Sequence, residues 1–230
     1  MEGLEQAWLG LEPYWRIEPS TTLKKHRTYD FLRWIIGPLC RVLLPWKIIG
    51  VNNIPKGKKM IIAANHLSHI DPIVIILSAR KKIHYLAKDG HFSNFFTRSV
   101  MNLTGQIETN RETGGDQALA SAATVIADGS TLGIFPEGTR SLDGKMKPFK
   151  KGGIILAINA GLPIVPMACC GTYDVLVKGS KTFNPKSIEL RFAPPISTKQ
   201  NDMDNRNEIT KRVENEVKRL KSEWNNIDLN

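Results

Sequence analysis

The chain has 230 residues, 41% of them hydrophobic and 23% charged, which suits one α/β domain, or two small ones, and excludes a globally disordered chain. Its formal net charge of +10 predicts attraction to polyanions, namely nucleic acid, anionic membrane surfaces or phosphorylated substrates, without choosing among them. An odd set of cysteines, Cys40, Cys169 and Cys170, argues against a disulfide framework and favours a reducing, cytosolic environment.

The N-terminal segment, residues 1–47, is expected to associate with membranes. Residues 1–20 contain several glutamates and no apolar run, so no secretory signal peptide is predicted. Residues 23–47 mix Lys and Arg with apolar side chains and are broken by Pro38, which predicts one or two amphipathic interfacial helices; the alternative is a helix that covers the core. The most apolar stretch, residues 34–46, is shorter than the roughly 20 residues that a membrane span needs.

Strands and helices alternate over the rest of the chain, residues 48–230, with the first strand beginning just before it. Buried or alternating apolar runs predict strands at residues 47–51, 60–64, 83–87, 106–109, 131–135, 164–169 and 188–192. Helical spacing and stop signals predict helices at residues 72–79, 92–103, 116–127 and 153–159, and a C-terminal amphipathic helix with Ile209, Val213, Val217, Leu220 and Trp224 on one face. This alternation predicts a single α/β domain with a mostly parallel central sheet flanked by helices.

The second predicted strand runs into a histidine-rich turn. His66 follows the apolar run, and Asp71 precedes Pro72, which is typical of a helix start with Asp71 as its N-cap. His66 would then lie at the carboxyl end of a strand and Asp71 at the entrance of a helix, both at the edge where α/β proteins place their sites. The turn between them is short enough to bring carboxylate and imidazole together.

Such a pair can act as a general base. A neutral imidazole removes a proton from an alcohol, and a carboxylate on its other nitrogen fixes the tautomer and stabilises the imidazolium. Spacing alone leaves alternatives open. Asp71 could only cap a helix, His69 could be the base or a metal ligand, and Ser68 could be a hydrolase nucleophile, although no nucleophile-elbow pattern surrounds it.

Further motifs follow later strands. Phe-Pro-Glu-Gly-Thr-Arg-Ser, residues 135–141, places a carboxylate, a flexible glycine and a fixed cation after a strand, where Arg140 could hold a phosphate. Gly-Gln-Ile-Glu-Thr-Asn-Arg ends at Arg111, and two prolines bracket an apolar strand in Leu-Pro-Ile-Val-Pro, residues 162–166. Each motif alone is a weak signal.

Taken in order, these motifs resemble those of the glycerolipid acyltransferase family, and within it the 1-acyl-glycerol-3-phosphate acyltransferases. The resemblance rests on Asn-His-x-Ser-His-x-Asp, Gly-x-Ile-x-x-x-Arg, Phe-Pro-Glu-Gly-Thr-Arg-Ser and Leu-Pro-Ile-Val-Pro, together with Pro-Phe-Lys-Lys-Gly at residues 148–152. It covers roughly residues 46–195, and it makes residues 48–230 an acyltransferase domain. Four motifs in the same order are far more specific than any one of them.

The resemblance implies an enzyme that transfers an acyl group from acyl-CoA or acyl carrier protein to the sn-2 hydroxyl of 1-acyl-glycerol-3-phosphate, forming phosphatidic acid in phospholipid biosynthesis. His66 would be the catalytic base and Asp71 its orienter, with no acyl-enzyme, metal or bound cofactor. Its substrate-binding candidates are Lys88, Arg111, Glu137, Gly138, Thr139 and Arg140. Lys88 falls in a region where such enzymes often read Ala-Lys-Lys-Glu-Leu, from which Asp89 and Gly90 depart.

The expected partners are lysophosphatidic acid, an acyl thioester and an anionic membrane surface, with an acyl carrier protein as an alternative donor. The expected location is the cytoplasmic face of a membrane, as a peripheral or monotopic protein. The alternatives are an acyltransferase for glycerol-3-phosphate or another lysophospholipid, and a non-catalytic basic membrane- or RNA-binding protein. No nucleic-acid partner is expected, because no aromatic RNA-binding signature, zinc spacing or basic recognition helix is found.

Overall fold

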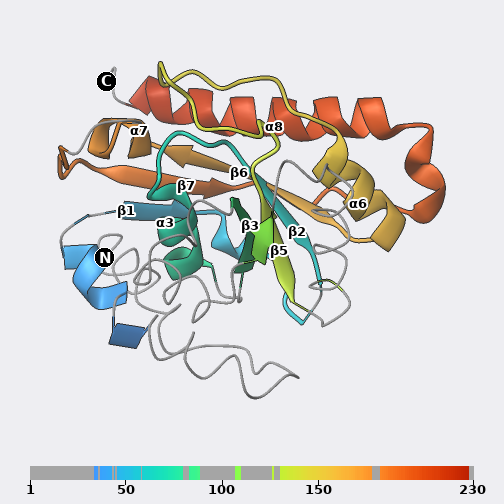
Figure 1. The fold of residues 1–230 in the computed structure, drawn as a ribbon, viewed down its shortest axis with the longest axis horizontal. Coiled ribbons are helices and arrows are strands. Elements are labelled where there is room, and N and C mark those ends of the chain that lie inside the picture. Colours follow the sequence, from blue (N-terminus) through green and yellow to red (C-terminus); the bar gives the residue numbers. More distant parts are fainter. Residues whose placement is uncertain are drawn as a thin grey trace.

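A seven-stranded sheet forms the centre of the computed structural model (Figure 1). Its strands run in the order β1-β7-β6-β2-β5-β3-β4, with bounds Trp46–Ile49 (β1), Ile61–Ala64 (β2), Ile83–Lys88 (β3), Ile107–Thr109 (β4), Thr131–Ile134 (β5), Ile164–Cys170 (β6) and Ile188–Phe192 (β7). The structure describes residues 34–35, 37–42, 44, 46–57, 59–79, 83–88, 107–109, 126, 130–177 and 182–227; for residues 86–88, 107–109 and 225–227 it describes the backbone only.

All neighbouring strands are parallel except β6 and β7, which pair antiparallel. The predicted mostly parallel α/β fold is therefore confirmed, and every strand predicted from the sequence is present with ends shifted by at most about two residues, the usual uncertainty of such boundaries. Because β2, β5, β3 and β4 are mutually parallel, they all end at one edge of the sheet. The segments that follow them meet there.

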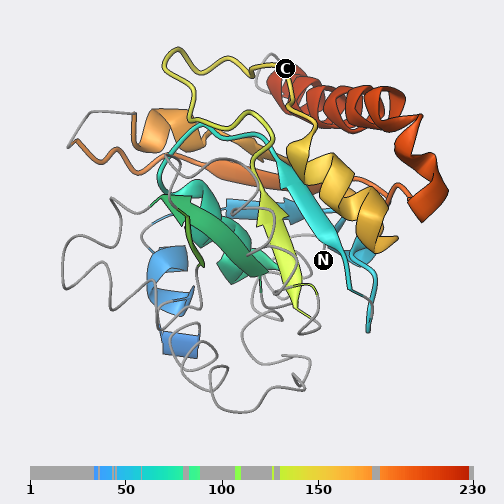
Figure 2. The same cartoon turned by 45° about the vertical axis from the view of Figure 1, so that its right-hand side comes forward.

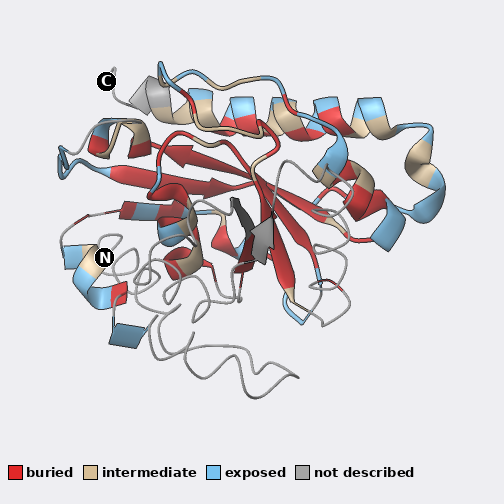
Figure 3. Ribbon diagram, in the orientation of Figure 1, coloured by how far each residue is buried: buried red, intermediate tan, exposed pale blue. Residues whose placement is uncertain are grey.

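Alternate residues of the buried strands face two different hydrophobic clusters. Along β2, Ile62 and Ala64 belong to one cluster, and Ile61 and Ala63 to the other. Helix α3 (Asp71–Ser78) packs in the first cluster, whereas α6 (Gly152–Ala160) and α8 (Arg206–Ile227) pack in the second. Both ribbon views place α8 and α3 on opposite sides of the sheet (Figures 1 and 2), and the strands between them are almost wholly buried (Figure 3).

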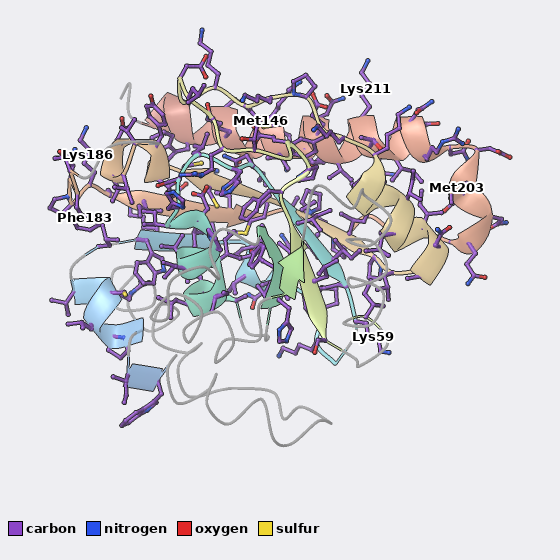
Figure 4. All side chains as sticks on the ribbon, in the orientation of Figure 1. Lys59, Met146, Phe183, Lys186, Met203 and Lys211 are labelled. Atoms are coloured by element: carbon purple, nitrogen blue, oxygen red, sulfur yellow. The ribbon has the colours of Figure 1, made fainter. Side chains whose placement is uncertain are left out.

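The helix ends follow the predicted signals. α6 stops at Gly161, whose φ of 61° is a left-handed conformation that glycine adopts without strain. α8 buries Val213, Val217 and Leu220, as its periodicity predicts, while Lys211 points away from the sheet (Figure 4). The sequence did not predict the short elements: helix α7 (Thr172–Val175) and the 3-10 helices η1 (Val51–Asn53) and η3 (Gln200–Met203).

The N-terminal segment is described only in part. Residues 34–35 and 37–42 are helical, and Trp34, Ile35, Leu39 and Val42 are among the most exposed large apolar side chains of the described residues. Within the described parts of the chain, no helix is both long and apolar enough to span a membrane. The helix predicted at residues 92–103, and all of the one at 116–127 except Ile126, lie outside the described residues. The division between residues 1–47 and 48–230 stays a prediction.

Candidate active site

The predicted site residues follow strands that end at one edge of the sheet. β2 leads into Asn65 and His66, and β5, its parallel neighbour, leads into Phe135 and residues 136–141. β3 ends at Lys88, paired with Thr109 at the end of β4. The parallel topology, rather than closeness in the sequence, brings these segments together.

Asn65 fixes the chain as it leaves β2. Its side chain is fully buried, its Nδ2 donates to the Cys169 carbonyl at 3.0 Å, and its Oδ1 accepts from the Cys169 backbone N–H at 2.7 Å. The amide thus continues the pairing with β6 after the strand itself has ended. The next residue, His66, therefore starts from a rigid position.

His66 and Asp71 meet across the turn. Nδ1 of His66 lies 2.9 Å from Oδ2 of Asp71, which is hydrogen-bond distance. The same Oδ2 accepts the backbone N–H groups of Leu67 and Ser68, each at 2.7 Å. Asp71 is fully buried, and the carboxylate thereby organises the whole turn around the imidazole.

The predicted N-cap role of Asp71 is wrong. The helix begins at Asp71 itself, Ile70 occupies the N-cap position, and no side chain caps the helix. The carboxylate instead accepts from the turn that precedes it, so it is not directed at the N–H groups of the first helical turn. Pro72 stands at the start of α3 as predicted.

Glu137 ties the two loops of the site together. Its Oε1 accepts the backbone N–H of His66 at 2.8 Å, and its Oε2 accepts that of Lys147 at 2.8 Å. The Ser141 N–H also donates to the His66 carbonyl at 2.8 Å. Burial raises the pKa of Glu137, and the hydrogen bonds from Lys147 and His66 partly oppose this rise. Both carboxylate oxygens serve the protein scaffold, so contact between Glu137 and a substrate stays a prediction.

Arg140 adds a cation near the pair. Burial lowers the pKa of its guanidinium, and the negative charge of Asp71 acts in the opposite direction. Its Nη1 and the Oδ1 of Asp71 are both buried, and neither has a hydrogen-bond partner among the described residues. A buried guanidinium nitrogen without a partner is suited to an anionic group of a ligand.

The imidazole lies on a second ring. The His66 side chain is 17% exposed, and its ring stacks on Phe135 with centroids 3.9 Å apart and planes 13° apart. Phe135 in turn stacks on Tyr85 of β3, with centroids 5.0 Å apart. Neither aromatic ring was among the site residues predicted from the sequence. Phe135 opens the Phe-Pro-Glu-Gly motif, so its position beside the predicted site was the available signal.

The other reactive groups of the turn are placed differently. Ser68 is fully buried and its hydroxyl donates to the Leu176 carbonyl at 2.7 Å, so it is not exposed as a nucleophile. His69 is exposed, and the carboxylate meets His66 instead. Among the described residues, no group of three or more His, Cys, Asp or Glu side chains could hold a metal ion.

The remaining predicted residues are only partly defined. Gly138 adopts a φ of 72° in the turn after Pro136, where a Cβ would lie 3.0 Å from Nζ of Lys150. Thr139 beside it is half-buried. Lys88 ends β3 with its side chain undescribed, and Arg111 lies outside the described residues.

A cavity of about 460 Å³ borders the turn between His66 and Asp71. Leu67 forms part of its wall, and α7, α8 and the loop after Arg140 supply the rest. The charged and aromatic residues that line it are Asp143, Lys145, Tyr173, Asp174, Lys218, Lys221 and Trp224. Its lysines outnumber its aspartates.

Known proteins resemble this chain along most of its length. It is 32% identical to a 1-acyl-sn-glycerol-3-phosphate acyltransferase of Limnanthes douglasii over 87% of this chain and 69% of that protein. It is also 32% identical to the enzyme of that name from Borreliella burgdorferi, over 65% of this chain and 60% of that one. The crystal structure of the 1-acyl-sn-glycerophosphate acyltransferase from Thermotoga maritima superimposes with a TM-score of 0.75 at 25% identity, over 98% of both chains.

The sequence model described as Acyltransferase matches residues 46–170, a span that contains the strand-end segments described above. This confirms the resemblance drawn from the ordered motifs. Because this model matches more than half of the chain, and the solved acyltransferase structure shares its fold over 98% of it, the chain belongs to the acyltransferase family.

Proposed function

We propose that this chain transfers a fatty acyl group from acyl-CoA or acyl carrier protein to the sn-2 hydroxyl of 1-acyl-glycerol-3-phosphate, forming phosphatidic acid. The observation that carries the proposal is the 2.9 Å contact between His66 and a buried Asp71, at the sheet edge where the segment after β2 meets the Phe-Pro-Glu-Gly segment after β5. The names of the relatives support the same acceptor.

His66 acts as the general base. Its Nδ1 faces Asp71, which leaves Nε2 to take the proton of the acceptor hydroxyl as the oxygen attacks the thioester carbonyl. The carboxylate stabilises the imidazolium that forms. The tetrahedral intermediate then collapses, the C–S bond breaks, and Nε2 returns the proton to the departing thiolate. The products are an ester and a free thiol, and no acyl-enzyme is formed.

Arg140 is our candidate for binding the acceptor phosphate, because its buried Nη1 has no partner among the described residues. Its guanidinium is also close enough to the catalytic pair for the charge of Asp71 to influence its pKa. Arg111 and Lys88 complete the proposed phosphate-binding subsite, because of their positions in the family motifs. Glu137 contributes by holding the His66 backbone. The cavity beside Leu67 is lined by three lysines and two aspartates, and we propose it as the place for the phosphate-bearing arm that both acyl carriers share.

A serine hydrolase is the competing chemistry, and the geometry disfavours it. A nucleophilic serine must be accessible and must meet its base, whereas Ser68 is buried and donates its proton to the Leu176 carbonyl. A different acceptor, either glycerol-3-phosphate or another lysophospholipid, is the nearer alternative, because all these acceptors offer a hydroxyl close to a phosphate group.

An acceptor panel tests the assignment. With labelled oleoyl-CoA as donor, we expect kcat/KM for 1-acyl-glycerol-3-phosphate to exceed that for glycerol-3-phosphate and for lysophosphatidylcholine by at least about tenfold, since only the first combines a terminal phosphate with an acyl chain. Acyl carrier protein is assayed as a second donor. Equal or faster transfer to glycerol-3-phosphate would replace the proposed acceptor, and thioester hydrolysis without transfer would replace the reaction.

We further propose that the helical residues 34–35 and 37–42 bind the membrane that holds the acceptor and the product. Trp34, Leu39 and Val42 are 60%, 59% and 83% exposed. Large apolar side chains grouped on one exposed segment mark a surface that contacts a partner or a membrane. Arg41 lies over the Trp46 ring at 5.0 Å, which places a cation beside them. Exposed apolar side chains with nearby basic groups are typical of an interfacial helix.

The triple variant Trp34→Ser, Leu39→Ser and Val42→Ser should weaken binding to anionic liposomes by at least about tenfold, because each apolar side chain contributes about 1.5 kcal/mol or more when it leaves water. Co-sedimentation with phosphatidylglycerol vesicles measures this. Leu142→Ser is the matched control, since Leu142 is 64% exposed but lies outside the helical segment. Equal loss in both proteins, or no loss in either, would contradict the membrane role of residues 34–42.

A further inference from the structure

The imidazole of His66, the ring of Phe135 and the ring of Tyr85 form one stack. We infer that Phe135 and Tyr85 are positioning residues that set the plane of the His66 imidazole. The rings of His66 and Phe135 lie 13° from parallel, and so do those of Phe135 and Tyr85. Tyr85 is buried, so the stack is anchored in the core. This inference rests on the proposed role of His66 as the base.

The sequence makes room for the stack through one glycine. Gly133 on β5 pairs with Tyr85 on β3, and a Cβ on Gly133 would lie 2.3 Å from Cε1 and 2.4 Å from Cζ of the Tyr85 ring. The ring therefore lies flat over the glycine, in space that any other residue would fill. Phe135 comes two residues after Gly133, which directs it to the same side of the strand and against the Tyr85 ring.

The stack supplies a constraint that the hydrogen bond lacks. The contact of Nδ1 with Asp71 fixes one atom of the imidazole, but the ring can still tilt about that contact. Terminal torsions between sp³ and sp² atoms are broad, so the side chain's own preference does not choose the tilt. A parallel ring at 3.9 Å does choose it, and with the tilt fixed the direction of Nε2 is fixed as well. Aromatic pairs prefer defined offset geometries, which gives the stack this orienting effect.

The experiment replaces the middle ring by a side chain of similar polarity without a flat face. We expect Phe135→Leu to lower kcat by about ten- to a hundredfold with KM within about twofold, because the misdirected base affects the reaction and not substrate binding. Phe135→Tyr should restore most of the activity, since it returns the ring. The proton NMR signal of the His66 Nδ1–H, assigned by its absence in His66→Ala, should broaden or shift in Phe135→Leu and recover in Phe135→Tyr.

Phe192→Leu is the control, because Phe192 has the same side chain, belongs to the hydrophobic cluster against which Phe135 packs, and lies on β7, away from β5. It should lose stability without the loss of kcat. Equal loss of kcat in this control, an unchanged NMR signal in Phe135→Leu, or failure of Phe135→Tyr to recover would each overturn the inference. If Phe135→Leu does not fold, the same comparison is made at Tyr85, the ring on the far side of Phe135 from His66, with Tyr85→Leu and Tyr85→Phe. The NMR signal requires no turnover, so it also separates failure of the stack from failure of the proposed reaction.

Discussion

Replacing His66 with alanine should lower acyl transfer by about 10²- to 10⁴-fold, the usual contribution of a positioned general base. This corresponds to a rise of about 3 to 5 kcal/mol in the activation barrier. The remaining activity would come from bringing the acceptor and the thioester together, which needs no proton acceptor on the protein. The measurement is initial-rate transfer from labelled acyl-CoA to 1-acyl-glycerol-3-phosphate.

The His66→Ala protein should remain folded. The contacts that hold the turn use its backbone: the N–H donates to Glu137 and the carbonyl accepts from Ser141. The side chain contributes one stack and one hydrogen bond, so its loss should cost about 1 to 3 kcal/mol in a urea titration. His69→Ala is the control, because His69 is exposed on the same turn, and it should keep near-normal activity. Full activity of a folded His66→Ala protein would end the assignment of His66 as the base.

The order of strands and helices could be predicted because it depends on local patterns. Strands buried on both faces of a mostly parallel sheet are continuously apolar. Apolar runs such as residues 60–64 and 164–169 therefore predict strands from their composition. The short helix α7 gave no such signal, since a single turn of helix lacks a detectable period. The antiparallel pairing of β6 with β7 also could not be read from either strand, because pairing depends on contacts distant in sequence.

The site shows the same division between local and distant information. The meeting of His66 and Asp71 was predictable from a strand end and a helix start that are a few residues apart. The hydrogen bond from the His66 backbone N–H to Glu137 joins residues 71 positions apart, and the Tyr85 ring that stacks on Phe135 comes from another strand. Neither follows from spacing. The misplaced N-cap has a related cause, because a capping propensity states that a carboxylate seeks N–H groups but not which ones.

Asp71→Asn should lower kcat by about 10²- to 10³-fold while leaving the turn intact. The Oδ2 position faces the N–H groups of Leu67 and Ser68, so the amide oxygen must occupy it and the NH₂ group must take the place of Oδ1. The oxygen still accepts from Nδ1 of His66, so the imidazole keeps the tautomer that leaves Nε2 free to accept a proton. Only the negative charge is lost. At an effective dielectric constant near 20, a charge pair at this range contributes about 4 kcal/mol to the imidazolium.

Asp71→Ala separates this charge effect from the structural one. Alanine leaves two buried N–H groups without an acceptor, each costing about 1 to 3 kcal/mol, so this protein should be clearly less stable than Asp71→Asn in urea and at least as inactive. If Asp71→Asn transferred acyl groups at the normal rate, the carboxylate would only support the turn. If it lost as much stability as Asp71→Ala, the two backbone N–H groups would not be orienting the amide. The pair of substitutions therefore measures independently how far one carboxylate builds the turn and how far its charge assists the imidazole.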